Sequence, residues 1–182
     1  MCGQYYCDAS TFSFLEEDEE VKMSPGEDIP VLLYYEGRII MTKLKWGYTL
    51  STKKELIINA RCETLLEKKI FKDDMLERRC VIPAKGFYQK DAKQHRISFE
   101  SQKHHKIYMT GIYRQVEKEV VIITTDANEV MRPVHQRMPL IIPKDKVKQW
   151  LEDRDEAIKL LHHKTEDLEI VSGYLQEALF QD

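Results

Sequence analysis

Short apolar runs rich in β-branched and aromatic residues recur through the middle of the chain, separated by polar and glycine-containing segments. Such runs are typical of β-strands. Two of them, 31–35 and 38–42, flank Glu36-Gly37 and predict a β-hairpin. Further strands are predicted at 56–58, 80–83, 96–99, 106–113, 120–125 and 140–142.

Helical patterns gather toward the two ends of the chain. The acidic run 16–20 predicts the solvent-facing side of an N-terminal helix, and apolar residues near the C-terminus recur at helical spacing. Asp126 or Asn128 is expected to cap a short helix that stops before Pro133. The other predicted helical segments are 12–22, 63–69, 144–151 and 153–162.

Length and composition narrow the class of protein. The 182 residues are 42% hydrophobic and 32% charged, which predicts one α+β domain over 1–182 with a helical tail at 143–182. No run approaches about 18 apolar residues, so no membrane-spanning helix is expected. The acidic N-terminal segment has no leader pattern, and the 4 cysteines are too few for a disulfide scaffold. We therefore expect a cytoplasmic protein with reduced thiols.

Charge is unevenly distributed along the chain. Residues 41–110 hold 16 Lys and Arg against 8 Asp and Glu, a net charge of +8 in a protein whose total is −3. This basic middle segment is typical either of a phosphate-facing patch or of the ordinary solvated faces of several elements. Charge alone does not separate these two interpretations.

The N-terminus carries a candidate nucleophile. Removal of Met1 would leave Cys2 with a thiol and a free α-amine on one residue, whose reference pKa values are about 8.5 and about 7.7–8.0. An aldehyde can form a Schiff base with this amine, and the neighbouring thiol can close a thiazolidine ring. Alternatively, Cys2 serves as an N-terminal nucleophile for amide hydrolysis, or it is a buried and inert thiol.

Several motifs, taken together, identify a resemblance. Asn59 opens N-A-R-C-E-T, Arg79 opens R-C-V-I-P-A-K-G-F-Y, and His135 opens H-Q-R-M-P. Smaller blocks accompany them in order at 1–3, 46–47, 110–113 and 124–128. This set resembles the SRAP (SOS response-associated peptidase) family, which includes the abasic-site processing proteins. The resemblance covers 2–142, with a weaker tail at Val171-Ser172, and implies a core of short antiparallel and mixed strands in a barrel-like sheet with peripheral helices.

The resemblance implies a chemistry for particular residues. Members of the family capture the ring-opened aldehyde of an abasic site in single-stranded DNA with an N-terminal cysteine, which matches Cys2. Asn59 matches an asparagine that hydrogen-bonds near the nucleophile. His135 matches a histidine that carries protons during imine formation and crosslink reversal. Gln89 stands where the family has a glutamate that assists opening of the sugar, and an amide cannot shuttle a proton.

The same resemblance implies a set of DNA contacts. Arg61 and Arg137 match arginines near phosphates, and Trp46 matches an aromatic residue that stacks on a base. Lys90 replaces a tryptophan and adds a cation that suits a phosphate, whereas Gln4 replaces the usual arginine after Met-Cys-Gly. We expect these five residues to line the DNA-contacting surface.

Three hypotheses about function follow. The first is an abasic-site processing protein that crosslinks single-stranded DNA through Cys2; the second is a non-catalytic single-strand-binding module, suggested by Gln89; the third is an N-terminal cysteine autopeptidase. We expect no cofactor and a monomer. No metal site is expected either, because adjacent histidines such as His104-His105 point to opposite faces of a strand and no C-x₂-C pair is present.

Overall fold

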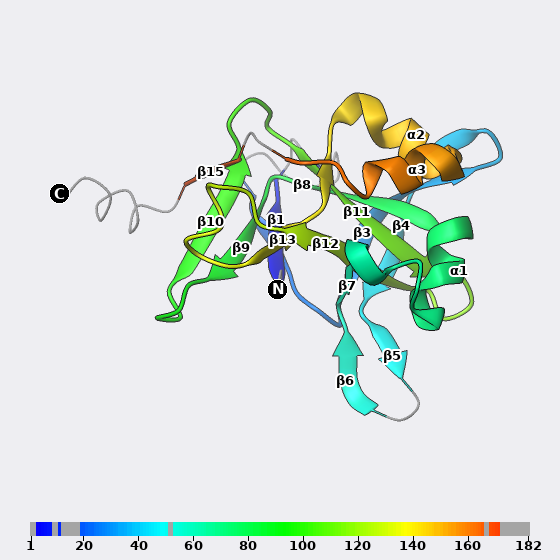
Figure 1. The fold of residues 1–182 in the computed structure, drawn as a ribbon, viewed down its shortest axis with the longest axis horizontal. Helices are drawn as coiled ribbons and strands as arrows, with labels where there is room; N and C mark the ends of the chain where they lie inside the picture. The colour runs from blue at the N-terminus through cyan, green and yellow to red at the C-terminus, as the bar shows by residue number, and fades with distance from the viewer. Residues whose placement is uncertain (1–2, 9–10, 12–18, 51–52, 166–167, 172–182) are drawn as a thin grey trace.

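The computed structural model describes residues 3–8, 11, 19–50, 53–165 and 168–171. Within these ranges the chain forms two large β-sheets, a separate hairpin and three α-helices (Figure 1). This arrangement confirms the predicted α+β class. No helix in the described ranges is long and apolar enough to cross a membrane.

The larger sheet, which we call the ring sheet, closes on itself. Its strand order is β13-β12-β4-β3-β8-β11-β14, and β7 joins beside β12. β12 also pairs with β11, so that β12, β4, β3, β8 and β11 complete a ring, as the predicted barrel-like core requires. The strands are β3 (Asp28–Tyr35), β4 (Arg38–Trp46), β7 (Asn59–Arg61), β8 (Arg79–Ala84), β11 (Ile107–Arg114), β12 (Glu119–Asp126), β13 (Arg137–Pro139) and β14 (Ile141–Ile142).

The second sheet, which we call the N-terminal sheet, has the order β15-β10-β9-β1-β2. Its strands are β1 (Gln4–Cys7), β2 (Val21–Met23), β9 (Gly86–Lys90), β10 (Arg96–Ser101) and β15 (Leu168–Ile170). β1 lies between β2 and β9, and Tyr5 is paired with Met23 on one side and Phe87 on the other. A hairpin of β5 (Tyr48–Leu50) and β6 (Lys53–Ile57) stands apart.

Two hydrophobic clusters connect these layers. One lies between the two sheets and includes Tyr5 and Phe87 from the N-terminal sheet together with Trp46 and Ile82 from the ring sheet. The other lies on the opposite face of the ring sheet, because neighbouring strand residues alternate sides. It is covered by α1 (Lys69–Glu77), α2 (Val147–Glu152) and α3 (Arg154–Leu160), with α1 beside β11 (Figure 1).

The strands and the hairpin predicted from the apolar runs are confirmed. The predicted helix at 12–22 is wrong over those of its residues that the structure describes. Val21–Met23 is the strand β2, which pairs with β1, and 12–18 lie outside the described residues. Residues 21–23 form a strand because they pair with β1. The acidic run indicates only that the preceding segment is polar, and not whether it is helical. The sequence pattern also missed β1 and α1.

Two further expectations need correction near the C-terminal half. Asn128 Oδ1 accepts a hydrogen bond from the backbone N–H of Met131 at 2.9 Å, as a cap would, but this segment is a series of turns rather than a helix. The C-terminal tail is only partly helical. A 3₁₀ turn, η2 (Lys144–Lys146), leads into α2, helix α3 ends at Leu160, and Leu168–Ile170 is a strand.

Gly86 generates a prediction about the N-terminal sheet. A Cβ atom at this position would lie 2.5 Å from the backbone oxygen of Phe99 and 2.5 Å from the Tyr6 hydroxyl. Gly86→Ala therefore forces β9 and β10 apart, and we expect the free energy of unfolding to fall by about 1–3 kcal/mol. Urea unfolding measures this change. The exposed substitution Gln102→Ala is the control, expected within about 0.5 kcal/mol of the parent, and equal stability of both variants would contradict the close packing.

Candidate functional site

The N-A-R motif at 59–61 and the H-Q-R-M-P motif at 135–139 lie on opposite sides of β12. β12 pairs with β7 along one edge, where Thr124 is aligned with Arg61, and with β13 along the other, where Asp126 is aligned with Arg137. Asn59 opens β7, and His135 lies just before β13. The structure therefore brings the N-A-R and H-Q-R-M-P motifs together, although 76 residues separate Asn59 from His135 in the sequence.

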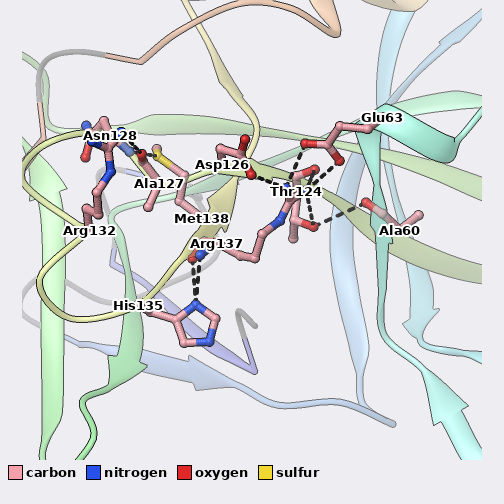
Figure 2. Close-up of polar contacts among 10 residues, drawn as sticks. All are labelled: Ala60, Glu63, Thr124, Asp126, Ala127, Asn128, Arg132, His135, Arg137 and Met138. Atoms are coloured by element: carbon pink, nitrogen blue, oxygen red, sulfur yellow. Dashed lines mark hydrogen bonds and ion pairs between the residues drawn. The ribbon is translucent and has the colours of Figure 1, made fainter.

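His135 is held by the backbone of Arg137. Its Nδ1 lies 2.9 Å from the Arg137 N–H, which donates to it, and 3.1 Å from the Arg137 carbonyl oxygen (Figure 2). A neutral ring that accepts at Nδ1 carries its proton on Nε2, whereas a charged ring can donate from Nδ1 to the carbonyl. The ring thus has a partner in both protonation states, which suits a residue that gains and loses a proton.

Burial shifts the balance between these two states. Desolvation lowers the pKa of His135 below its ordinary value, and the positive charge of Arg137 adds to this effect. The neutral ring is therefore favoured at neutral pH, where it can accept a proton.

Arg137 does not face solvent as the sequence suggested. Its guanidinium lies 2.7 Å from a carboxylate oxygen of Glu63 and 2.6 Å from one of Asp126, and it donates to the Thr124 carbonyl at 2.7 Å (Figure 2). Its side chain is only 12% exposed. Because two carboxylates balance its charge, Arg137 ties β12, β13 and the 3₁₀ turn η1 (Cys62–Thr64) together rather than presenting a free cation to a phosphate.

Asn59 and Arg61 share one face of β7. The residue between them, Ala60, is buried against the helix-covered cluster, so alternation places its two neighbours on the opposite side of the strand. Asn59 is half-buried and Arg61 is exposed. The two side chains therefore lie on the same side of β7, with Asn59 the more buried of the two.

Trp46 is buried, whereas an exposed position was expected for a residue that stacks on a base. Its ring is 0% exposed, so no face of it is accessible to a base in this structure. Instead, its indole N–H donates to the Ile58 carbonyl at 3.0 Å, and its ring packs 5.5 Å from that of Tyr5. Trp46 therefore joins β1, near the N-terminus, to the residue that precedes Asn59. The expected stacking role is not supported by this geometry.

The remaining candidate residues belong to the N-terminal sheet. Gln89 is 5% exposed and is paired with the buried Ile97, within the side of β9 that faces the core. Lys90, the next residue, is exposed at the end of the strand. Gln4 is half-buried, is paired with Tyr88 of β9, and donates from Nε2 to Ser24 Oγ at 3.2 Å, just after β2. Cys2 lies outside the described residues, two positions before the start of β1.

Sequence reasoning missed several residues that shape this region. Glu63 and Asp126 lie inside the quoted motifs, and a search for carboxylates able to balance Arg137 would have found them. Arg96 was also missed; its guanidinium stacks over the Tyr88 ring at 4.5 Å from the centroid. Residue 88 belongs to the G-F-Y motif, but only the pairing of β9 with β10 shows that Arg96 is its neighbour.

Comparisons with known proteins agree on one family. A family model described as SOS response associated peptidase (SRAP) matches residues 1–172. The abasic site processing protein YoaM of Bacillus subtilis is 30% identical over 158 residues, covering 77% of this chain and 69% of YoaM. The abasic site processing protein YoqW of Bacillus subtilis is 30% identical over 163 residues, covering 78% of this chain and 72% of YoqW.

A solved structure supports the fold. The crystal structure of a phage-related protein from Bordetella bronchiseptica aligns with a TM-score of 0.73 at 18% identity, covering 93% of this chain and 92% of that one. At this identity the similarity supports a shared arrangement of the two sheets and carries no information about the reaction.

The Arg137 cluster predicts a pH effect on stability. The hydrogen bond from Arg137 lowers the pKa of Glu63 in the folded state. A depressed carboxyl pKa contributes stability above the unfolded value, about 4.3, and this contribution is lost as the pH falls through the lower folded value. We therefore expect Glu63→Gln to lower the melting temperature at pH 7 and to show a smaller further loss between about pH 5 and pH 3 than the parent protein.

Glu67→Gln is the matched control, because Glu67 is exposed and forms no ion pair with a described residue, yet the change in charge is the same. Thermal unfolding from pH 3 to pH 7 measures both variants. Equal pH dependence of Glu63→Gln and Glu67→Gln would show that the Arg137 contact does not stabilise the fold.

Proposed function

Because this chain belongs to the SRAP (SOS response associated peptidase) family, we propose that it binds single-stranded DNA and forms a covalent crosslink with the aldehyde of an abasic site through Cys2. Several curated relatives are named abasic site processing proteins. The proposed substrate places its action on DNA, in the cytoplasm at the nucleoid. A monomer remains our prediction.

The proposed reaction uses both nucleophiles of Cys2 after removal of Met1. The free α-amine attacks the aldehyde carbon, and loss of one water from the adduct gives an imine. The thiol sulfur then adds to the imine carbon, forming a C–S bond, while the thiol proton passes to the nitrogen. The product is a thiazolidine, in which DNA and protein share one five-membered ring. The second step is fast because it is intramolecular.

The observation that carries this proposal is the convergence of β1 and β7 on Trp46. Covalent geometry keeps the Cα atom of Cys2 within about 7 Å of that of Gln4, where β1 begins. Tyr5 in β1 packs on Trp46, which holds the carbonyl of Ile58, the residue before Asn59. The strand that begins at Asn59 therefore lies near β1, which supports a site shared by Cys2 and Asn59.

His135 is the proposed proton carrier. Its lowered pKa favours the neutral ring at neutral pH, so it can take the proton that the attacking amine releases. In the neutral tautomer that carries its proton on Nδ1, the ring donates to the Arg137 carbonyl and can take a proton from the reactants on the lone pair of Nε2. Arg137 is a positioning residue in this proposal, because it acts through His135 and the surrounding strands.

Arg61 and Lys90 are the proposed phosphate contacts. Both side chains are exposed, and neither forms an ion pair with a described carboxylate. Exposed cations of this kind attract the DNA backbone without reading its sequence, and their contribution weakens as salt rises. Arg96, which is exposed and paired with Lys90 across β9 and β10, extends the same surface.

Gln89 favours a second candidate, a single-strand-binding module that makes no covalent bond. A buried amide can hold a hydrogen bond where the family has a glutamate, but it cannot transfer a proton. Loss of a general acid or base typically costs about 10²–10⁴-fold in rate. The two candidates differ in whether any crosslink forms, and in whether a carboxyl group at this position speeds it.

Cys2→Ala tests the first candidate. Protein with Met1 removed, as verified by its intact mass, is incubated with a single-stranded oligonucleotide that contains one abasic site and is then run on a denaturing gel. We expect the parent protein to give a band of slower migration that survives heating in detergent, and Cys2→Ala to give none. Cys62→Ala is the control and should still crosslink, because burial raises the pKa of that thiol. Crosslinking by Cys2→Ala would refute the proposed nucleophile.

Gln89→Glu tests whether the missing carboxyl group limits the rate. Burial beside Ile97 raises the pKa of a carboxyl group at this position, so that it can donate a proton near neutral pH. We expect crosslinking to accelerate by about 10²-fold. Gln102→Glu adds the same charge at an exposed position and should leave the rate unchanged. If no crosslink forms with either Gln89 or Gln89→Glu, the binding-module candidate is the better account.

A further inference from the structure

A pocket lies away from the candidate site, between the β10–β11 connection, β14 and the segment that follows α3. Its volume is about 480 Å³, within the range of about 300–1,000 Å³ that small-molecule sites occupy. None of the residues assigned to the candidate site lines it. The proposed reaction at the candidate site therefore does not account for this pocket.

The rim of this pocket is basic. It carries three lysines and three histidines: Lys103, Lys106, Lys144, His104, His105 and His163. No carboxylate is among the described lining residues, and no described residue forms an ion pair with any of the three lysines. Glu166 and Asp167 follow the lining residue Thr165 in sequence and lie outside the described residues. A rim of this charge attracts an anion.

Two hydrogen-bonded walls keep the pocket in shape. Ser101 Oγ accepts hydrogen bonds from the backbone N–H groups of Lys103 and His104, each at 3.2 Å, and thereby fixes the turn that bears the rim. On the other side, the buried Thr165 hydroxyl donates to the Ile141 carbonyl at 2.9 Å. The walls are therefore formed before any ligand arrives.

The remaining lining residues include an apolar group. Tyr108 is half-buried and Pro143 is exposed, so both offer accessible apolar surface in the pocket, beside the buried lining residues Ile107, Ile141, Ile142 and Leu168. An apolar surface beside cations matches a ligand with a flat ring and a phosphate, because the ring can leave water while the phosphate meets the lysines. A metal ion fits less well, since no three His, Cys, Asp or Glu side chains converge among the described residues.

We propose that this pocket binds a nucleoside phosphate, with the base on the apolar lining and the phosphate at Lys103, Lys106 and Lys144. The same chemistry is offered by a free nucleotide and by a nucleotide of single-stranded DNA. The pocket uses no covalent step, so it does not depend on Cys2 or on the proposed crosslinking reaction.

Fluorescence anisotropy with two probes tests the proposal on the full chain. The probes are a fluorescently labelled ATP and a labelled, undamaged oligothymidylate, titrated at several salt concentrations. The pocket variant is Lys103→Gln/Lys106→Gln/Lys144→Gln. The matched control is Lys68→Gln/Lys69→Gln/Lys72→Gln, which removes the same charge from exposed positions at the N-cap and in the first turn of α1.

We expect the pocket variant to bind at least one probe about tenfold more weakly than the control variant. Loss of ATP binding identifies a free-nucleotide site. Loss confined to the oligonucleotide, with a salt slope lower by about 2, identifies a DNA contact. If the two variants bind both probes equally, the proposal is wrong. Because the oligonucleotide carries no abasic site, this result is independent of whether Cys2 forms a crosslink.

Discussion

The buried indole of Trp46 is the contact on which the candidate site depends. It packs on Tyr5, donates to the Ile58 carbonyl, and so connects the N-terminal sheet with the ring sheet at one point of the shared core. This bridge places β1 near the strand that begins at Asn59. The resemblance identified Trp46 as an important residue, but its contribution in this structure is to position two chain segments rather than to stack on a base.

The positive charge of Arg137 is compensated by carboxylates within the site, so Arg137 is not a free cation that could attract a phosphate. The guanidinium of Arg137 forms ion pairs with Glu63 and Asp126, while its backbone contacts the His135 ring. The residue proposed as the proton carrier is thus held by protein groups rather than by solvent. In the proposed function, attraction of a phosphate backbone falls to exposed cations such as Lys90, at the end of a strand in the N-terminal sheet.

The sequence predicted the elements that local pattern decides and missed those that depend on distant pairing. The hairpin around Glu36-Gly37 follows from turn chemistry, since both residues adopt positive φ, and it was predicted correctly. β1 is only four residues long and exists because it pairs with β2 and β9, which no local pattern reveals. In α1, the buried Asp74 interrupts the apolar face, because its carboxylate accepts a hydrogen bond from Tyr48 and pairs with Arg78. Motifs located the candidate site, but only the folded chain shows that Trp46 is buried and that Arg137 is paired.

The most direct test of the account is the intact mass of the complex formed with an oligonucleotide that contains one abasic site. We expect a species whose mass equals the protein without Met1 plus the oligonucleotide, minus one water. Imine formation releases this water, and ring closure by the thiol releases nothing. Proteolysis should then place the DNA on the peptide that begins with Cys2. Attachment of DNA to any other residue, or recovery of only unmodified protein from both the parent chain and Gln89→Glu, would contradict it.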